Sequence, residues 1–133
     1  MNELVKSRES FMYVNVDNHL FKRVRNSEYV DKSELIALTN KVIDTEDQYI
    51  CVTRPRRFGK SVAVKMLNAY YSKGCVSKAL FSDLKIASSP DFESHLNQHD
   101  VIYLDMTEFA DNKDNGNKYL ENLNTDVVSE LKD

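Results

Sequence analysis

A glycine, a lysine and a serine in succession are the residues of this chain whose types and spacing could do chemistry. Gly59, Lys60 and Ser61 close the stretch Thr53–Ser61, which reads T-R-P-R-R-F-G-K-S. A glycine lets backbone N–H groups approach a phosphate, a lysine can reach its oxygens, and a serine hydroxyl suits Mg²⁺. The stretch therefore predicts a phosphate-binding loop of the Walker A type, whose template is G-x-x-x-x-G-K-[ST].

The first position of the loop departs from that template, because Arg54 stands where the first glycine is expected. The last three positions, which meet the phosphate, are intact. We expect the loop to bind a nucleotide, ATP or GTP, together with Mg²⁺, with Ser61 as the ligand of the metal. The loop itself does not distinguish the two bases. The predicted nucleotide-binding residues are Arg54, Pro55, Arg56, Arg57, Phe58, Gly59, Lys60 and Ser61.

The charge of the loop leaves two other interpretations open. Three arginines and Lys60 place four positive charges between residues 54 and 60, enough to contact a nucleic-acid backbone or a partner protein in a module without catalysis. An unspecific basic turn is the third interpretation. The rest of the chain is acidic, since 21 Asp and Glu outnumber 18 Lys and Arg. A local positive cluster in an acidic chain favours a defined anion site.

The elements on both sides of the loop fit the same prediction. Tyr49–Thr53 is a β-branched and aromatic run of strand length. Val62–Tyr71 contains no helix breaker, and Gly74 follows where a glycine often ends a helix. Strand, loop and helix is the order that a phosphate-binding loop requires.

A second helix is predicted before this strand. Asp31 is a suitable N-cap, and Glu34 follows it by three residues, as in a capping box. The apolar residues behind them recur at helical spacing: Leu35, Ile36, Leu38, Val42 and Ile43. A short strand over Phe11–Val16 is also expected.

Two segments together resemble the signatures of the AAA-ATPase-like family of predicted bacterial P-loop proteins. They are Tyr29–Ile36, which reads Y-V-D-K-S-E-L-I, and the loop itself. The similarity covers about residue 21 to the end, which makes 21–133 the N-terminal part of an AAA-ATPase-like P-loop domain and 1–20 an extension. It implies that arginine at position 54 is typical of the family, and that Asp31 and Lys32 are near the nucleotide. The competing interpretation of these two residues is a helix cap and a solvated first turn.

The resemblance also implies a second, C-terminal domain similar to PD-(D/E)xK nucleases, through which the intact protein could meet nucleic acid. Hydrolysis would require a carboxylate that orients water and usually an arginine from another segment or subunit. We expect both beyond Asp133, so that this chain alone does not turn over nucleotide.

Asp100–Met106 is the second predicted strand, and it ends in an acidic residue. Asp105 could therefore be a Walker B carboxylate near Mg²⁺, or a strand-end residue without a catalytic role. Met106 follows it instead of a glutamate, and the family has its Walker B strand later, which favours the second interpretation. Glu108 is a similarly unsupported candidate.

The predicted fold class is α/β, the N-terminal part of a three-layer P-loop NTPase sheet with parallel strands and flanking helices. A last helix carries Leu120, Leu123, Val127 and Leu131, and it stops at Asp133 without a cap or an exit strand. This ending predicts an incomplete domain.

Composition sets the outer limits. A chain of 133 residues can bury one core. No stretch is apolar enough for a membrane span and the N-terminus lacks a signal core, so we expect a cytoplasmic protein without membrane contact. Cys51 and Cys75 are expected to be buried. His95 and His99 are four residues apart, a spacing that suits metal ligands, but without an H-E-x-x-H pattern we expect surface histidines.

Overall fold

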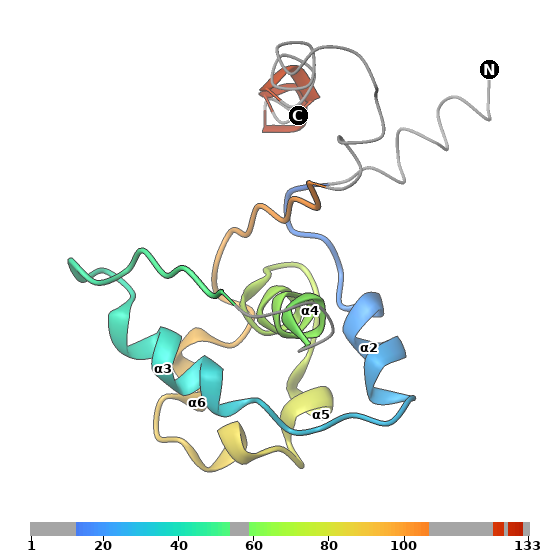
Figure 1. Cartoon of the computed structure of the whole chain (residues 1–133), viewed down its shortest axis with the longest axis vertical. Helices are drawn as coiled ribbons and strands as arrows, with labels where there is room; N and C mark the ends of the chain where they lie inside the picture. The colour runs from blue at the N-terminus through green and yellow to red at the C-terminus, as the bar shows by residue number, and fades with distance from the viewer. Residues whose placement is uncertain (1–12, 54–58, 107–123, 127, 132–133) are drawn as a thin grey trace. The chain divides into compact units, whose positions relative to one another are not determined.

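The computed structural model describes residues 13–53, 59–106, 124–126 and 128–131, which belong to two compact units (Figure 1). The larger unit spans Asp17–Asp100, and the smaller one joins Met1–Val16 to Val101–Asp133. The larger unit contains, in chain order, α2 (His19–Arg25), α3 (Glu34–Val42), α4 (Lys60–Tyr71), α5 (Lys78–Phe81), the 3₁₀ helix η1 (Lys85–Ser88) and α6 (Phe92–His95).

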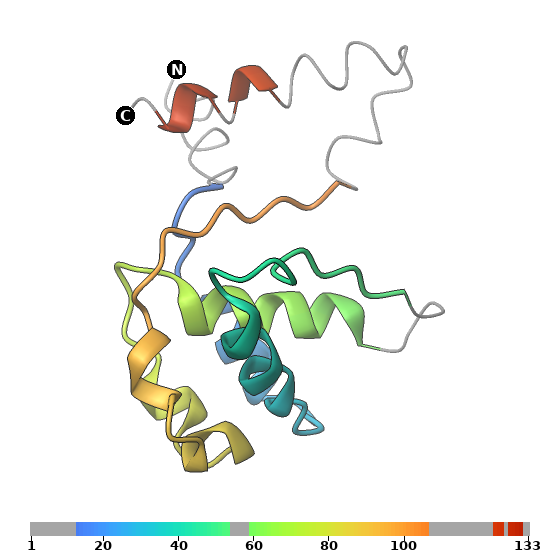
Figure 2. The same cartoon turned by 90° about the vertical axis from the view of Figure 1, so that its left-hand side faces the viewer.

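The core of the larger unit is built around α4. Figure 1 looks along this helix and shows α2 and α3 on opposite sides of it. Figure 2 shows α4 along its length. Aromatic side chains join the helices: Phe21 of α2 stacks on Phe81 of α5 at 5.0 Å between ring centroids, and Tyr70 of α4 meets Phe81 edge to face at 5.6 Å. All three are fully buried, so the unit is held by packing between helices.

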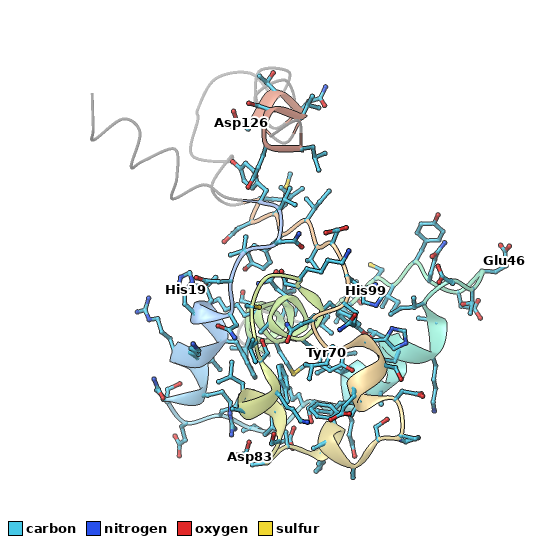
Figure 3. All side chains as sticks on the ribbon, turned by 180° about the vertical axis from the view of Figure 1, so that it is seen from behind. His19, Glu46, Tyr70, Asp83, His99 and Asp126 are labelled. Atoms are coloured by element: carbon cyan, nitrogen blue, oxygen red, sulfur yellow. The ribbon has the colours of Figure 1, made fainter. Side chains whose placement is uncertain are left out.

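A hydrogen-bonded chain of polar side chains runs through this core. The Tyr70 hydroxyl donates to the carbonyl oxygen of Phe92 at 2.7 Å and lies 3.3 Å from Asn40 Nδ2, which donates to it. The Tyr71 hydroxyl donates to Asn40 Oδ1 at 2.5 Å. Burial raises the pKa of Tyr71 to about 12, so its hydroxyl stays protonated and able to donate. Figure 3 shows Tyr70 among the helices of the unit. The network fixes α4 against α3 and α6.

The helices on both sides of the loop are confirmed, but their ends differ from the prediction. α3 begins at Glu34 with Ser33 at the N-cap, two residues after Asp31, so the predicted cap at Asp31 was wrong. Asp31 instead accepts the backbone N–H of Ser33 at 2.9 Å and that of Lys85 at 2.8 Å. α4 is followed by extended Ser72, and Gly74 comes two residues later with a φ of +86°. Two short helices, α5 and α6, follow α4 along the chain, and Leu84 and Ile86, which lie between them in sequence, are buried.

The predicted α/β class with a parallel sheet was wrong for the part of the chain that the structure describes. That part is helical and contains isolated bridges but no strand. The run predicted as the strand before the loop is irregular and exposed, with 87% of Tyr49 and 54% of Val52 accessible to solvent. A β-strand needs a neighbour for its backbone hydrogen bonds, and the described residues pair none with this run. The strand was predicted from side-chain type alone. In the structure, the core consists of residues from the helices and the segments between them.

The smaller unit brings the other two predicted strands together, in antiparallel orientation. Val14 and Ile102 form one antiparallel bridge, supported by a hydrogen bond from the Asn15 N–H to the carbonyl oxygen of Val101 at 2.8 Å. The Glu130 carboxylate, on a helical stretch at residues 128–131, accepts the backbone N–H of Tyr13. Among the described residues, no helix has the length and apolar character needed to cross a bilayer.

Candidate functional site

Gly59 makes the turn from the phosphate loop into α4. It is the N-cap of the helix and has a left-handed backbone, with φ +81° and ψ 19°. Residues with a side chain rarely adopt this conformation, because Cβ then crowds the backbone. The carbonyl oxygen of Gly59 accepts the N–H of Ala63 at 2.9 Å, which closes the first turn. The glycine predicted from the motif is therefore required by the local geometry.

The start of α4 is the positive end of the helix dipole. The first N–H groups of any helix have no partner within the helix, and the helix dipole places partial positive charge there. Among the described residues no side chain caps this terminus, and its first turn contains no acidic residue. Lys60 and Ser61 are both exposed at this position. A lysine at a helix N-terminus is electrostatically unfavourable unless an anion is bound, so the local charge suits an anionic ligand.

A second lysine reaches the same turn from another element. A Cβ at position 59 would lie 2.7 Å from Nζ of Lys32 and 3.8 Å from its Cε. Lys32 comes just before α3, in the Y-V-D-K-S segment. The structure thus places Lys32 next to Gly59, which follows it by 27 residues in the sequence. The two residues belong to the two segments on which the family resemblance rests. The functional interpretation of Lys32 stays a prediction, and its side chain is exposed in the turn before α3.

The segment around Lys32 is anchored on both sides. The Tyr29 hydroxyl lies 3.2 Å from Sδ of Met66 in α4, and its ring packs edge to face on Phe21. Ser33 is fully buried, and its Oγ accepts the backbone N–H of Ile86 at 3.1 Å. Lys32 itself is exposed between these two contacts. Tyr29, Ser33 and Met66 were missed at the sequence level, although the first two belong to the family segment.

Asp31 acts in this anchor as a charged acceptor. Its burial alone would raise the pKa of the carboxyl, but the hydrogen bonds from Ser33 and from the backbone N–H of Lys85 outweigh burial and lower it. The carboxylate therefore stays ionised near neutral pH and holds the turn before α3 against η1. Its role is structural in this respect, and it fixes the backbone from which Lys32 extends.

The family of the chain is decided by its match to one family model. The model described as "Predicted AAA-ATPase" matches residues 14–133, nearly the whole chain. The chain belongs to this family. No curated protein and no solved structure matches it significantly. Membership of the predicted AAA-ATPases implies use of ATP, in agreement with the family resemblance of the two segments.

The remaining predicted site residues of this AAA-ATPase-like chain fall into two groups. Arg54, Pro55, Arg56, Arg57 and Phe58 lie outside the described residues, as does Glu108. Asp105 is described and exposed, but it belongs to the smaller unit, whereas the start of α4 belongs to the larger one. Within the larger unit, the structure brings together Gly59, Lys60, Ser61 and Lys32.

The two histidines form a contact instead of standing separately on the surface. His95 Nδ1 and His99 Nε2 lie 3.0 Å apart, and the rings stack with centroids 5.2 Å apart. Both are partly buried, and the ring of His99, labelled in Figure 3, also packs edge to face on Tyr71. No group of three or more potential metal ligands was found among the described residues. The cysteines also differ from expectation, since Cys51 is exposed and Cys75 is partly buried.

Proposed function

We propose that this AAA-ATPase-like chain binds Mg-ATP at the N-terminal end of α4. The observation that supports the proposal best is the turn at Gly59, whose left-handed backbone starts a twelve-residue helix with Lys60 at its first position. An uncapped helix start with two lysines and no acid in its first turn attracts phosphate. The G-K-S sequence and the family description both agree with a nucleotide as the source of that phosphate.

Each residue of the turn has a separate role in the proposal. Backbone N–H groups at the start of α4 would donate to phosphate oxygens, and Lys60 would balance their charge. The donors near the turn fit Mg²⁺ only in part, since the exposed hydroxyl of Ser61 is one oxygen ligand. Mg²⁺ usually takes one or two protein ligands and fills its shell with waters and phosphate oxygens. The metal would therefore arrive with the nucleotide and assist in neutralising its charge.

The proposal covers binding and leaves hydrolysis out. Phosphoryl transfer to water needs a carboxylate or amide that orients the water. The first turn of α4 supplies no acidic residue. We expect the isolated chain to show no steady-state ATP hydrolysis. Turnover that disappears in Lys60→Ala would contradict this expectation.

Calorimetric titration of the 133-residue chain with Mg-ATP tests the proposal. We expect saturable binding that is lost in Lys60→Ala and kept in Lys65→Ala, which removes a lysine from the same helix one turn and a half further on. A chain that is folded by circular dichroism and does not bind millimolar Mg-ATP would refute it. Binding to nucleic acid that weakens steeply with salt, without nucleotide binding, would support the interaction module instead.

A further inference from the structure

We infer that His95 and His99 together bind one transition-metal ion of the Zn²⁺ or Ni²⁺ class, next to the last turn of α4. The starting observation is that the two rings face each other through ring nitrogens, with His95 Nδ1 at 3.0 Å from His99 Nε2. The proposed nucleotide site is at the first turn of the same helix, so the inference goes beyond the proposed function and does not rest on it.

The spacing of the two nitrogens suits coordination of a single ion. Imidazole nitrogens bind Zn²⁺ at about 2.0–2.1 Å, so two of them at a bond angle of roughly 90–110° are about 2.9–3.4 Å apart. The observed 3.0 Å falls within this interval. A metal ion would replace the proton that two neutral rings share in an N–H···N hydrogen bond, and the ring that donates that proton would carry it on its other nitrogen. No net proton has to leave the neutral pair.

The backbone holds both histidines in place before any ion binds. His95 is the last residue of α6, and Asn97, which lies between the two histidines, donates its N–H to a carbonyl oxygen of α4 at 2.7 Å. The N–H of His99 donates to the carbonyl oxygen of Tyr71 at 2.9 Å, and the carbonyl oxygen of His99 accepts the N–H of Lys73 at 2.9 Å. Two ligands that are already positioned lose little conformational entropy when they bind an ion.

The surroundings of the pair favour a cation. Both rings are partly buried, and the His99 ring packs edge to face on Tyr71 with centroids 5.4 Å apart. Asp44 and Asp100 act on His99 as negative charges. Lys73 opposes them, but its ammonium lies 3.2 Å from the Asp100 carboxylate. Of these three charged side chains, the two carboxylates outnumber the lysine, so an ion at the pair meets a net attraction.

The ligand type selects the class of metal. Imidazole nitrogen suits Zn²⁺, Ni²⁺ and Cu²⁺, whereas Mg²⁺ and Ca²⁺ take oxygen ligands. No group of three or more potential ligands occurs among the described residues, so water would fill the other positions of the ion. We therefore expect an open, exchangeable site that is weaker than a structural zinc site with four protein ligands. A bound ion would tie α6 to the segment that follows α4.

Calorimetric titration of the untagged, chelator-treated chain with ZnCl₂ and with NiCl₂ tests the inference. We expect saturable binding of one ion by wild type. His95→Gln and His99→Gln should each weaken it by at least about tenfold, because the loss of even an outer partner of a metal ligand costs about 10–100-fold in affinity. The matched controls are His19→Gln, which removes the third histidine of the chain, and Cys51→Ser, which removes an exposed thiol. Both controls should bind as wild type does.

Nitrogen NMR of the wild-type imidazoles gives a second readout, which needs no folded variant. Zn²⁺ should shift the resonances of His95 Nδ1 and His99 Nε2 and leave those of His19 unchanged. Unchanged resonances of His95 and His99 at millimolar Zn²⁺ would refute the site, even if a histidine variant fails to fold.

The calorimetric outcomes are equally decisive. Folded wild type that binds neither Zn²⁺ nor Ni²⁺ at millimolar metal overturns the inference. Binding that survives His95→Gln or His99→Gln, or that is lost in His19→Gln or Cys51→Ser, also overturns it, because other residues would then hold the ion. The nucleotide site is tested separately, since Lys60→Ala should keep metal binding and His99→Gln should keep Mg-ATP binding.

Discussion

The two ends of α4 differ in almost every physical respect. Its last turns are buried, with Met66, Ala69 and Tyr70 inaccessible to solvent and joined to the surrounding helices. Its first residues, Lys60 and Ser61, are exposed, and Gly59, which precedes them, has a left-handed backbone. One end stabilises the unit and the other exposes positive charge to solvent. Substitutions at the two ends should therefore change different observables.

The division agrees with a general trade-off between stability and binding. A helix start with two lysines and no acidic residue is less stable than one with a capping side chain and an acid in its first turn. The packing of the last turns of the same helix offsets this lower stability of the helix start. Damage to the packed end should unfold the unit, whereas damage to the charged end should leave the fold intact and remove binding.

The largest effect is expected at the packed end, from Tyr70→Ala. This change empties a fully buried site and removes the hydrogen bonds to Phe92 and Asn40. Large aromatic truncations in a core lower the free energy of unfolding by about 3–5 kcal/mol. Urea denaturation followed by circular dichroism measures the loss. Tyr70→Phe keeps the ring and should lose about 1–3 kcal/mol, through the unpaired carbonyl and amide alone. Equal losses in the two variants would show that packing does not dominate here.

Asn97 is expected to give the next largest effect. Its backbone is left-handed, with φ 56°, and its side chain accepts the N–H of Ser77 at 3.0 Å and donates to the carbonyl oxygen of Ser72 at 2.8 Å. Asn97→Ala removes these hydrogen bonds and should cost about 2–3 kcal/mol of unfolding free energy. Asn97→Gly removes the same bonds but tolerates the backbone, so it should be less destabilising by about 1 kcal/mol. A larger loss in Asn97→Gly would rule out backbone strain as a contribution.

At the charged end, Gly59→Ala is paired with a matched control. Gly59 and Gly74 have nearly the same φ, +81° and +86°. Alanine at either position should cost about 1–2 kcal/mol through backbone strain. A Cβ at Gly74 would meet nothing within 4 Å, whereas one at Gly59 would meet Lys32 Nζ. Only Gly59→Ala should therefore weaken Mg-ATP binding, measured by calorimetry. Equal affinities of the two variants for Mg-ATP would show that neither Lys32 nor the turn at Gly59 takes part in nucleotide binding.

The sequence predicted the parts of this molecule that depend on local chemistry. Helical spacing placed α3 and α4, and the G-K-S motif identified a glycine that the backbone requires. The sheet could not be predicted correctly, because Tyr49–Thr53 has the side chains of a strand but its exposed backbone finds no partner among the described residues. Strand pairing depends on distant segments, and side-chain type is only a weak guide to it.

The site was predicted in the same uneven way. Lys60 and Ser61 follow from the motif, and Lys32 from the family segment, but the contacts that hold Lys32 come from residues with no chemical signature. Tyr29 and Ser33 look like ordinary turn residues in the sequence. Their role depends on Met66 and Ile86, which lie more than 30 residues away along the chain. Only the fold shows such pairs.

The smallest expected effect concerns pH and again belongs to the packed end of α4. Burial lowers the pKa of His99 below its usual value of 6.5, and the charges of His95 and Lys73 lower it further, while Asp44 and Asp100 oppose them. The backbone N–H of His99 donates to the carbonyl oxygen of Tyr71, the last residue of α4. His99 therefore lies next to the packed end of this helix. Because the folded protein resists protonation at His99, the unfolded chain binds this proton more readily. The stability contributed by neutral His99 is complete above pH 6.5 and is lost as the pH falls below it.

Urea midpoints measured between pH 7.5 and pH 5 should therefore decrease as the pH falls in wild type and change less in His99→Gln. His95 Nδ1 lies 3.0 Å from His99 Nε2, and the charge of His95 is one of the influences that lower the pKa of His99. An increase in stability on acidification would show that the histidine pair favours protonation in the folded state. The packed end of α4 would then also stabilise a charged group, and the two ends of the helix would no longer differ in this respect.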